Sequence, residues 1–375
     1  MRVYAFHGGT KTNSGVRGKD DTVMPEKIVH LKHQVCDYSC MWNGIEDIYM
    51  TKTGEEIPQF FFFCLSGVGN IAYLKRKDEW LPRQLIFGDG RPKKIYGNIS
   101  EIAGFTFKFA EGRTFPNALK GIKEQIDVGK PVVLGPLDMF HLPYLKFYHK
   151  FHIPIHYILM VGYNDETQSI YVLDCGKEEM QTLPLEDLRM AWEIEKSSVG
   201  GANEFVKIEF ADSLKSTREI AELALRKKAK EMLEPQVSFV GVKGLRKAAK
   251  ELPGWESELS PQGYKNSLMN ILEFLGTVPK LPNIVMGFDA PEDEGMLYQA
   301  CREKMGNMLK TLGETYHSRN WKDAAELFFK SGKCFEEVAG HLIRFLNKGE
   351  NQLEEIPLLF EKIADLETAA YQLLL

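Results

Sequence analysis

The hydrophobic positions in the first half of the chain occur in short runs separated by turn residues. The runs are rich in Phe, Val, Ile and Tyr, and Gly, Pro, Asn or Asp stand between them. This pattern is typical of β-strands joined by turns. Two other segments, 40–50 and 116–128, are predicted to be helices. The predicted strands lie at residues 59–65, 94–96, 105–109, 131–134, 156–163, 169–174 and 205–210.

A helical period replaces these runs after residue 212. In the segment 214–233, Ile220, Leu223 and Ala224 recur at i, i+3 and i+4 spacing, opposite a charged face. Pro and Gly residues then separate further apolar periodic segments and mark their ends. These predicted helices lie at residues 241–252, 262–275, 292–316, 321–346 and 353–374.

The chain length fits this change of pattern. At about 100–200 residues per domain, 375 residues suggest two domains or three small ones. We expect an irregular N-terminal segment over residues 1–27 and an α+β domain over residues 28–211. An all-helical domain is expected over residues 212–375.

Charge and composition narrow the class of protein. The chain has 47 Lys and Arg residues against 52 Asp and Glu residues, a net charge of −5, which argues against a nucleic-acid partner. Six cysteines in this length do not make a disulfide framework and fit a reduced, cytoplasmic protein. Residues 1–21 lack the apolar core of a signal peptide. The most apolar stretch, 60–74, falls short of the ~20 residues of a membrane span, so no membrane contact is expected.

Candidate chemistry begins with a cysteine at a predicted helix start. Ser39 is a suitable N-cap residue, which would put Cys40 in the first helical turn. There the helix dipole and the unpaired N–H groups favour the thiolate, the nucleophilic form of cysteine. Gln34, six residues earlier, is placed to donate its side-chain amide to a developing oxyanion. Cys36 also lies close to Gln34 and remains an alternative nucleophile.

Two later segments supply partners for such a thiol. His156 begins a predicted strand and Asp174 ends the next one. If the intervening turn centres on Asp165, these two residues face each other across the hairpin. A carboxylate that orients an imidazole, which in turn activates a thiol, is the arrangement of a nucleophilic cysteine enzyme.

These pieces together resemble papain-like cysteine peptidases, most of all the bacteriocin-leader peptidase branch. More specifically, the segments 129–144 and 156–174 resemble the N-terminal domain of the butirosin biosynthesis protein H family. The helical half, through segments such as 241–252, 295–298 and 363–367, resembles the domain that usually follows it.

The resemblance implies a papain-like cysteine protease fold with an all-helical C-terminal domain. It also implies acyl transfer in the biosynthesis of an antibiotic or other natural product. An acyl group would pass from a carrier protein's phosphopantetheine thioester to the enzyme cysteine and then to a small-molecule amine, forming an amide. The catalytic residues would be Cys40, His156, Asp174 and Gln34, with no cofactor beyond the phosphopantetheine arm of the acyl or peptidyl carrier protein. Family members usually carry His directly before the nucleophile, where this chain has Ser39.

Two other functions fit the same residues. A cysteine hydrolase would let water resolve the acyl-enzyme, and a non-catalytic binding module would use a peptidase-like fold without chemistry. The histidines 141, 149 and 152 form a loose cluster without a supporting carboxylate, so no metal site is expected. The basic runs Lys93–Lys94 and Arg226–Lys228 are expected on solvated surfaces, where they would be available to steer an acidic carrier protein.

Overall fold

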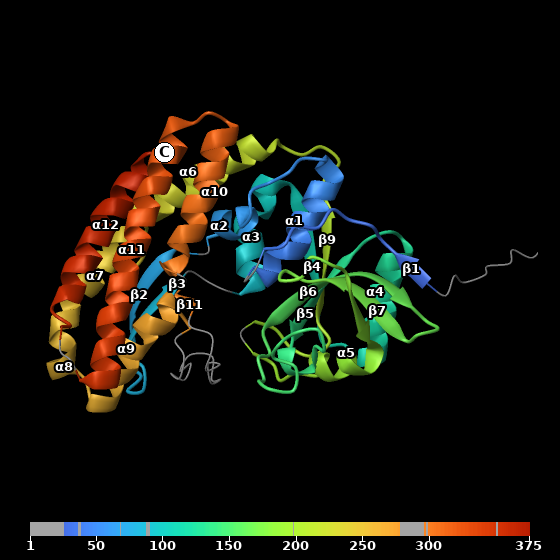
Figure 1. Cartoon of the computed structure of the whole chain (residues 1–375), viewed down its shortest axis with the longest axis horizontal. Helices are drawn as coiled ribbons and strands as arrows, with labels where there is room; N and C mark the ends of the chain where they lie inside the picture. The colour runs from blue at the N-terminus through green and yellow to red at the C-terminus, as the bar shows by residue number, and fades with distance from the viewer. Residues whose placement is uncertain are drawn as a thin grey trace, which may run out of the picture.

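The chain folds into a sheet-containing part and a helical part (Figure 1). The computed structural model describes residues 26–36, 39–67, 69–87, 91–197, 199–277, 296–297, 299–349 and 352–375. Helices and strands mix in the first part of the chain, which confirms the α+β class. Most of the irregular segment expected over 1–27 lies outside the described residues. Residues 26 and 27 begin a strand.

The main sheet has seven antiparallel strands. Their order is β4 (Phe105–Ala110), β9 (Phe205–Phe210), β5 (Val132–Leu137), β6 (His156–Asn164), β7 (Ser169–Leu173) and β8 (Gln181–Pro184), with β1 (Glu26–Ile28) also paired to β6. Five of the predicted strands are confirmed. They are the runs 105–109, 131–134, 156–163, 169–174 and 205–210.

Helices cover both faces of this sheet. Helix α1 (Cys40–Thr53) contacts β5 and β6 on one face, while α4 (Phe115–Asp127) and α5 (Leu185–Trp192) lie on the other. Strand β6 sends Tyr157 and Leu159 into the core on the α1 side, and Ile158 and Met160 into the core on the α4 side. Because both faces of β6 are buried, its sequence is a continuous apolar run.

A glycine allows α1 to approach the sheet closely. A Cβ added at Gly44 would lie 2.9 Å from Leu159 Cδ1 and 3.2 Å from Val133 Cγ2, which is closer than normal packing distances. The first turns of α1 are thereby held against the strands that carry the candidate site.

The second part of the chain is formed mainly by helices. They are α6 (Thr217–Leu233), α7 (Gly241–Glu251), η2 (Leu252–Gly254), α8 (Trp255–Glu258), α9 (Pro261–Leu275), η3 (Gln299–Cys301), α10 (Arg302–Thr315), α11 (Arg319–Lys348) and α12 (Glu355–Gln372), with a small pair of strands, β10 (Gly276–Thr277) and β11 (Met296–Leu297). Helix α11 packs against α10 and α12 along its length. The helix expected over 292–316 is observed only from Arg302 onward, and part of that range lies outside the described residues. No helix among the described residues is long and apolar enough to span a bilayer.

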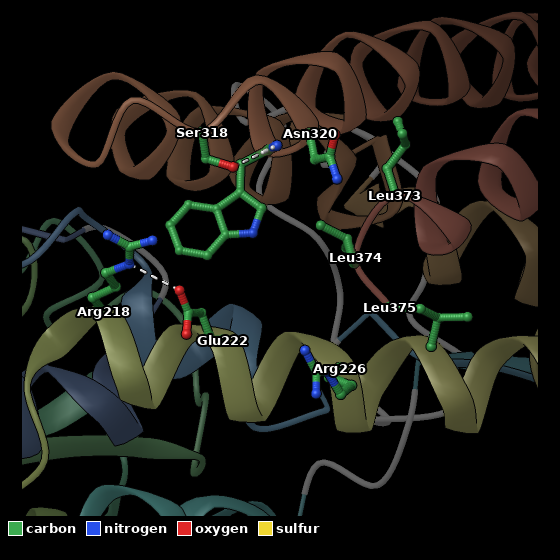
Figure 2. A pocket seen from close by; sticks show the side chains of 9 residues that line it. Arg218, Glu222, Arg226, Ser318, Asn320, Leu373, Leu374 and Leu375 are labelled. Carbon is green, nitrogen blue, oxygen red and sulfur yellow. Dashed lines mark hydrogen bonds and ion pairs between the residues drawn. The ribbon is translucent and has the colours of Figure 1, made fainter.

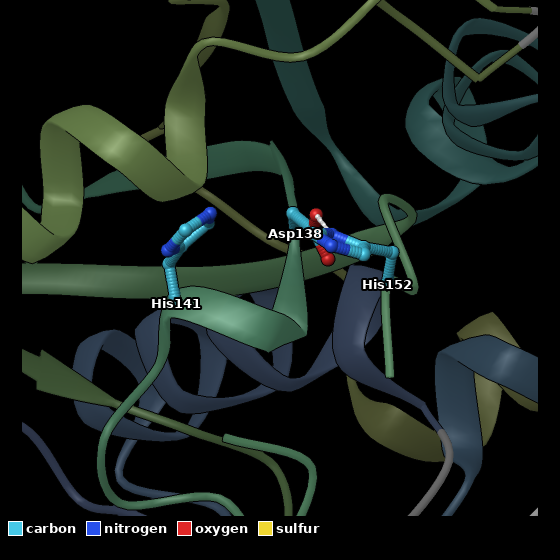
Figure 3. A group of neighbouring side chains, drawn as sticks. All are labelled: Asp138, His141 and His152. Carbon is cyan, nitrogen blue, oxygen red and sulfur yellow. Dashed lines mark hydrogen bonds and ion pairs between the residues drawn. The ribbon is translucent and has the colours of Figure 1, made fainter. Parts of the chain in front are cut away.

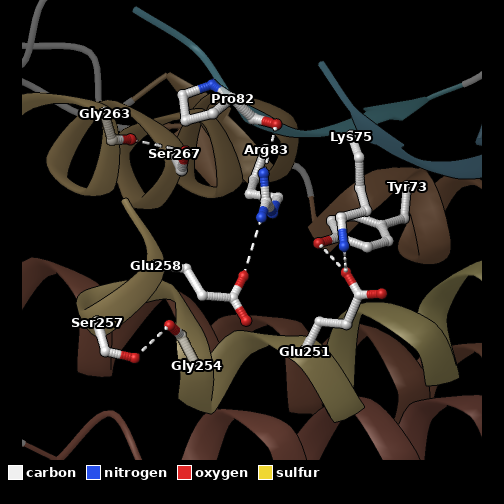
Figure 4. Close-up of polar contacts among 10 residues, drawn as sticks. All are labelled: Tyr73, Lys75, Pro82, Arg83, Glu251, Gly254, Ser257, Glu258, Gly263 and Ser267. Carbon is white, nitrogen blue, oxygen red and sulfur yellow. Dashed lines mark hydrogen bonds and ion pairs between the residues drawn. The ribbon is translucent and has the colours of Figure 1, made fainter. Parts of the chain in front are cut away.

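A hairpin from the first half of the chain lies among these helices. Strands β2 (Ile71–Lys75) and β3 (Arg83–Phe87) pack on α7 and α9. Tyr73 donates a 2.8 Å hydrogen bond to Glu251, to which Lys75 also pairs, and Arg83 pairs with Glu258 at 3.0 Å (Figure 4). The sequence pattern after residue 212 therefore marks a change of secondary structure, while contacts between the two parts reach back at least to Tyr49, whose hydroxyl lies near that of Thr217.

Two predicted strands are helical. The run 59–65 contains α2 (Phe61–Leu65), whose buried residues Phe61, Cys64 and Leu65 lie at helical spacing. Residues 94–96 belong to α3 (Pro92–Ala103), which starts with Pro at its first position, a place that suits the fixed backbone angle of proline. Aromatic and β-branched content suggested strands here, but burial against neighbouring helices decides the local structure.

Candidate active site

Cys40 is the first residue of α1, as expected from its position after Ser39. Ser39 occupies the N-cap position but makes no side-chain cap. Its hydroxyl donates instead to the Cys36 carbonyl at 2.7 Å. Ser39 therefore holds the predicted N-cap position but forms no capping hydrogen bond, because the loop before the helix uses its hydroxyl to close a turn. The Cys40 side chain is partly exposed at the positive end of the helix.

His156 begins β6 and contacts Asp174, which follows β7. Their Nε2 and Oδ2 atoms lie 2.8 Å apart, and both side chains are almost wholly buried, with 8% and 1% exposed. Since Asp174 occupies Nε2, the Nδ1 atom is the ring nitrogen left for the Cys40 thiol. Cys40 lies close enough to the imidazole to contribute to the raised pKa of His156. The fold thus brings together three of the four site residues named from the sequence.

The two strands reach this contact in a different register from the one expected. Asn164 pairs with Ser169 and Leu159 pairs with Leu173, with a bulge between them, so Asp174 is not directly opposite His156. The turn is longer than predicted because the Asn164 side chain accepts hydrogen bonds from the N–H groups of Glu166 and Thr167. The prediction of direct opposition is wrong, and the two side chains meet diagonally.

The electrostatics of this group favour a charged imidazole. Burial opposes the charged form of His156, but the Asp174 carboxylate, through its charge and hydrogen bond, raises the pKa of the imidazole well above its usual range, and Cys40 adds to this rise. Burial likewise opposes ionisation of Asp174, yet the neighbouring His156 lowers the pKa of the carboxyl. An imidazolium held by a buried carboxylate can stabilise a thiolate at its other nitrogen.

Cys36 has a different environment. It is 1% exposed and its sulfur accepts a hydrogen bond from the Phe60 N–H at 3.2 Å. Burial, with a contribution from the Glu46 charge, raises the pKa of its thiol to about 12. Its backbone N–H binds the Cys175 carbonyl, which ties this loop to the residues after β7. A buried thiol of this kind is a poor nucleophile.

The Gln34 side chain contacts the segment that follows α1. Its side-chain amide donates to the Ile57 carbonyl at 3.3 Å, and its Oε1 atom is buried without a hydrogen-bond partner. It lines a cavity of about 670 Å³ together with the loop 56–60 and residues of α10, among them Asn307 and Thr311. No contact described in the structure joins its side chain to Cys40, so its oxyanion role stays a prediction.

Sequence reasoning missed one polar pair that positions the site. His33 Nδ1 lies 2.7 Å from Asp47 Oδ2 on α1, and its Nε2 lies 2.7 Å from the Lys177 carbonyl. The ring therefore links the loop before Cys40 both to the helix and to the segment after Asp174. The only sequence signal was the occurrence of His33 directly before Gln34.

Tyr144 belongs to the same neighbourhood. Burial, and then the nearby charge of Asp174, raise the pKa of its phenol, and its hydroxyl forms no hydrogen bond of normal geometry. It lies in the long connection between β5 and β6, where Asp138, His141 and His152 also converge as potential metal ligands. The expectation that this histidine cluster lacks a supporting carboxylate is therefore wrong, because the chain folds back and brings Asp138 to within 2.6 Å of His152.

The basic runs expected on solvated surfaces are partly engaged. Lys228 is buried, and burial lowers its pKa to about 8, while Lys227 donates to the Asn98 carbonyl. Arg226 lines a cavity of about 250 Å³ together with Trp321 and the last three residues of the chain (Figure 2). Lys93 pairs with Glu111. The expectation of a solvated surface is therefore wrong for Lys228.

Comparisons with known proteins agree with the resemblance seen in the sequence. Residues 39–175 match the family described as "Butirosin biosynthesis protein H, N-terminal", and residues 195–277 match "Domain of unknown function (DUF4872)". An uncharacterized protein, YobF of Bacillus subtilis (strain 168), is 27% identical over 150 residues, or 40% of this chain and 46% of that protein. The aligned region thus spans just under half the length of this relative.

Proposed function

We propose that this protein is a cysteine-dependent acyltransferase of antibiotic or other natural-product biosynthesis. Its residues 39–175 match the N-terminal domain of the butirosin biosynthesis protein H family, which supports this role. One observation carries the proposal: Cys40 starts a helix beside His156, and His156 is held by the buried Asp174. A helix with an N-terminal cysteine that packs on an antiparallel sheet bearing His and Asp also supports a papain-like fold.

The reaction would proceed through a thioester on Cys40. The Cys40 thiolate attacks the thioester carbonyl of an acyl or peptidyl carrier protein, and the bond to the phosphopantetheine sulfur breaks. His156 supplies the proton that the leaving thiol takes up. An amine then attacks the acyl-enzyme, His156 accepts the amine proton, and the amide leaves with the Cys40 thiolate restored. Asp174 keeps Nδ1 of His156 directed at the sulfur throughout.

The oxyanion of each tetrahedral intermediate needs hydrogen-bond donors. We assign this role to the Cys40 backbone N–H and to the Gln34 side chain, where loss of one donor typically costs ~10²–10³ in rate. The amide of Gln34 is held by a single 3.3 Å hydrogen bond to Ile57, which is weak enough to be exchanged when a substrate binds.

The helical part would shape the amine site. The cavity beside Gln34 has polar walls from α10, which include Asn307, Thr311 and Tyr316. The buried Oε1 of Gln34 is an acceptor without a donor, and an amine N–H would satisfy it. We therefore place the small-molecule acceptor in this cavity.

Product analysis tests the proposal. The full chain is incubated with an acyl-carrier thioester and a set of candidate amines, and amide and free acid are quantified by mass spectrometry. Acyl transfer predicts amide formation that Cys40→Ala abolishes and Cys36→Ala retains. Free acid alone would identify a hydrolase. A rate unaffected by Cys40→Ala would identify a non-catalytic role for the fold.

A further inference from the structure

Three side chains that bind metals in many proteins converge in the connection between β5 and β6. One potential ligand atom each from Asp138, His141 and His152 lies within 4.8 Å of the other two. Figure 3 shows Asp138 between the two histidines. His141 comes from the short turn η1 (Met139–His141), and His152 from the chain returning to β6. We propose that these three residues bind one divalent transition-metal ion, and that zinc is the ion that suits them best.

The carboxylate is fixed in place by the backbone. Its Oδ1 atom accepts hydrogen bonds from the N–H groups of Phe140, at 3.1 Å, and Ile153, at 2.9 Å. This leaves Oδ2 for ligation, and the Asp138 side chain is only 11% exposed. Backbone hydrogen bonds to a ligand in this manner orient it and are a regular feature of metal sites.

The histidines are also held before a metal arrives. The His152 ring stacks on Phe140 with centroids 4.0 Å apart and an interplanar angle of 12°. Its Nδ1 lies 2.6 Å from Asp138 Oδ2, and the side chain is 65% exposed, which gives an ion a path from solvent. His141 is half-buried within η1, whose first turn the Asp138 side chain caps.

The donor set and spacing decide which ion fits. Two imidazoles and one carboxylate, without a thiolate, match three-ligand zinc sites that keep a fourth position open. In a tetrahedral site with bonds of about 2.0–2.1 Å, ligand atoms lie about 3.4 Å apart. The hydrogen bond between Asp138 and His152 would therefore lengthen by less than about 1 Å as a metal replaces the bridging proton. Side-chain rotations are enough for this change.

A bound ion would close the connection into a loop. It would join residues 138 and 141 to residue 152, and Tyr144, beside Asp174, lies between these ends. The ion would thus act as a structural clamp next to the catalytic pair. Its existence does not depend on the chemistry proposed for Cys40.

Metal titration of the full chain tests the site. Chelator-treated protein is titrated with Zn²⁺ by calorimetry and with Co²⁺ by visible absorption. We expect one equivalent to bind, and His141→Ala and His152→Ala each to weaken binding at least tenfold. His149→Ala is the matched control: this histidine lies in the same connection with its ring centroid 5.1 Å from that of Phe140, and its replacement should leave the affinity unchanged.

Two further measurements separate this site from other causes. Cys40→Ser removes the other cluster that could capture a metal, and binding should persist, with no Co²⁺–thiolate charge-transfer band in either protein. Zn²⁺ should raise the melting temperature of the wild-type chain and not that of His141→Ala, since an ion that binds only the folded state stabilises it. Absence of saturable binding, loss of binding in Cys40→Ser, or full binding by the two ligand variants would each overturn the proposal.

Discussion

Replacement of Asp174 by Asn tests the electrostatic reasoning at the site most directly. The amide keeps the size of the side chain and a hydrogen-bonding oxygen near His156 Nε2, but removes the negative charge. That charge is the main reason why the pKa of His156 is raised in spite of burial. In Asp174→Asn we therefore expect a mostly neutral imidazole at pH 8, which no longer stabilises a thiolate at its other nitrogen.

The size of the effect follows from Coulomb's law. Two unit charges about 4 Å apart interact by about 4 kcal/mol at an effective dielectric constant of about 20. One pKa unit corresponds to about 1.4 kcal/mol, so the pKa of His156 should fall by up to about 3 units. From about 10, such a fall would bring the pKa of His156 to about 7, so most of the imidazolium would be lost at pH 8.

Alkylation of Cys40 is a suitable assay. The rate of reaction with iodoacetamide is measured from pH 5 to pH 9, and the peptide that contains Cys40 is quantified by mass spectrometry. We expect the rate at pH 8 to fall by up to about tenfold in Asp174→Asn, because the imidazolium is then mostly deprotonated. The matched control is Asp165→Asn, which removes a half-buried carboxylate, paired with Lys123, from the turn of the same hairpin, and it should retain the wild-type rate. If folded Asp174→Asn reacts as the wild type does throughout this range, the thiolate–imidazolium reasoning is refuted.

Three other substitutions test the fold around the site, each by urea unfolding. Gly44→Ala places a Cβ 2.9 Å from Leu159, so it should lower the free energy of unfolding by about 1–3 kcal/mol and slow Cys40 alkylation. The control is Gly97→Ala, in α3 with open space around it, which should raise the free energy of unfolding by about 0.5–1 kcal/mol. Equal effects of the two variants would contradict the close approach of α1 to the sheet. Glu367→Gln removes the carboxylate charge beside the buried Arg302 and should lower the free energy of unfolding by about 3–5 kcal/mol. Glu124→Gln, in an exposed pair, is the control and should cost less than about 1 kcal/mol. A cost as small as that of the control would show that water reaches the Arg302–Glu367 pair. Burial raises the pKa of Glu46 to about 8, so the folded state holds a proton that the unfolded state releases, and the free energy of unfolding falls as the pH rises from about 4.5 to 8. Glu46→Gln should remove this loss and stabilise the protein more at pH 8 than at pH 5. If the pH dependence of stability is unchanged in this variant, Glu46 is not its source.

The candidate catalytic group could largely be predicted from the sequence because each member stands at the end of a regular element. Cys40 begins a helix, His156 begins a strand, and Asp174 follows a strand, so local pattern placed all three. The register between β6 and β7 was not readable, because it depends on the Asn164 side chain and on a bulge. His156 and Asp174 are in contact although the predicted register is wrong, because diagonal neighbours in a sheet remain within reach of each other's side chains.

Residues in loops were harder to place. The environment of Gln34 is set by the Ile57 carbonyl and by α10, which are distant in sequence. Likewise, His152 and Asp138 are 14 positions apart, and their contact depends on how the intervening chain turns. Neither loop has a periodicity from which a spatial neighbour could be predicted.

The hairpin β2–β3 could not be predicted from the sequence pattern either. The segment after β2 is charged, and Arg83 and Gln84 on β3 are buried, so the region lacks the clean alternation of a half-buried strand. Its position is determined by residues more than 150 positions later, including the bridge of Ala72 to Val240 and the Glu251 side chain. Tertiary contacts, rather than local pattern, specify this element.

Tertiary contacts also join α1, the helix that begins with Cys40, to the helical part of the chain. One hydrophobic cluster runs from Tyr157 and Leu159 on β6, through Trp42 and Ile45 on α1, into the helices after residue 212. The Tyr49 hydroxyl of α1 also lies 3.2 Å from the Thr217 hydroxyl at the start of α6. Helix α1 is therefore held from both sides, by the sheet that carries His156 and by the helices that line the cavity beside Gln34. A change in the packing of the helical part should therefore alter how α1 lies on the sheet.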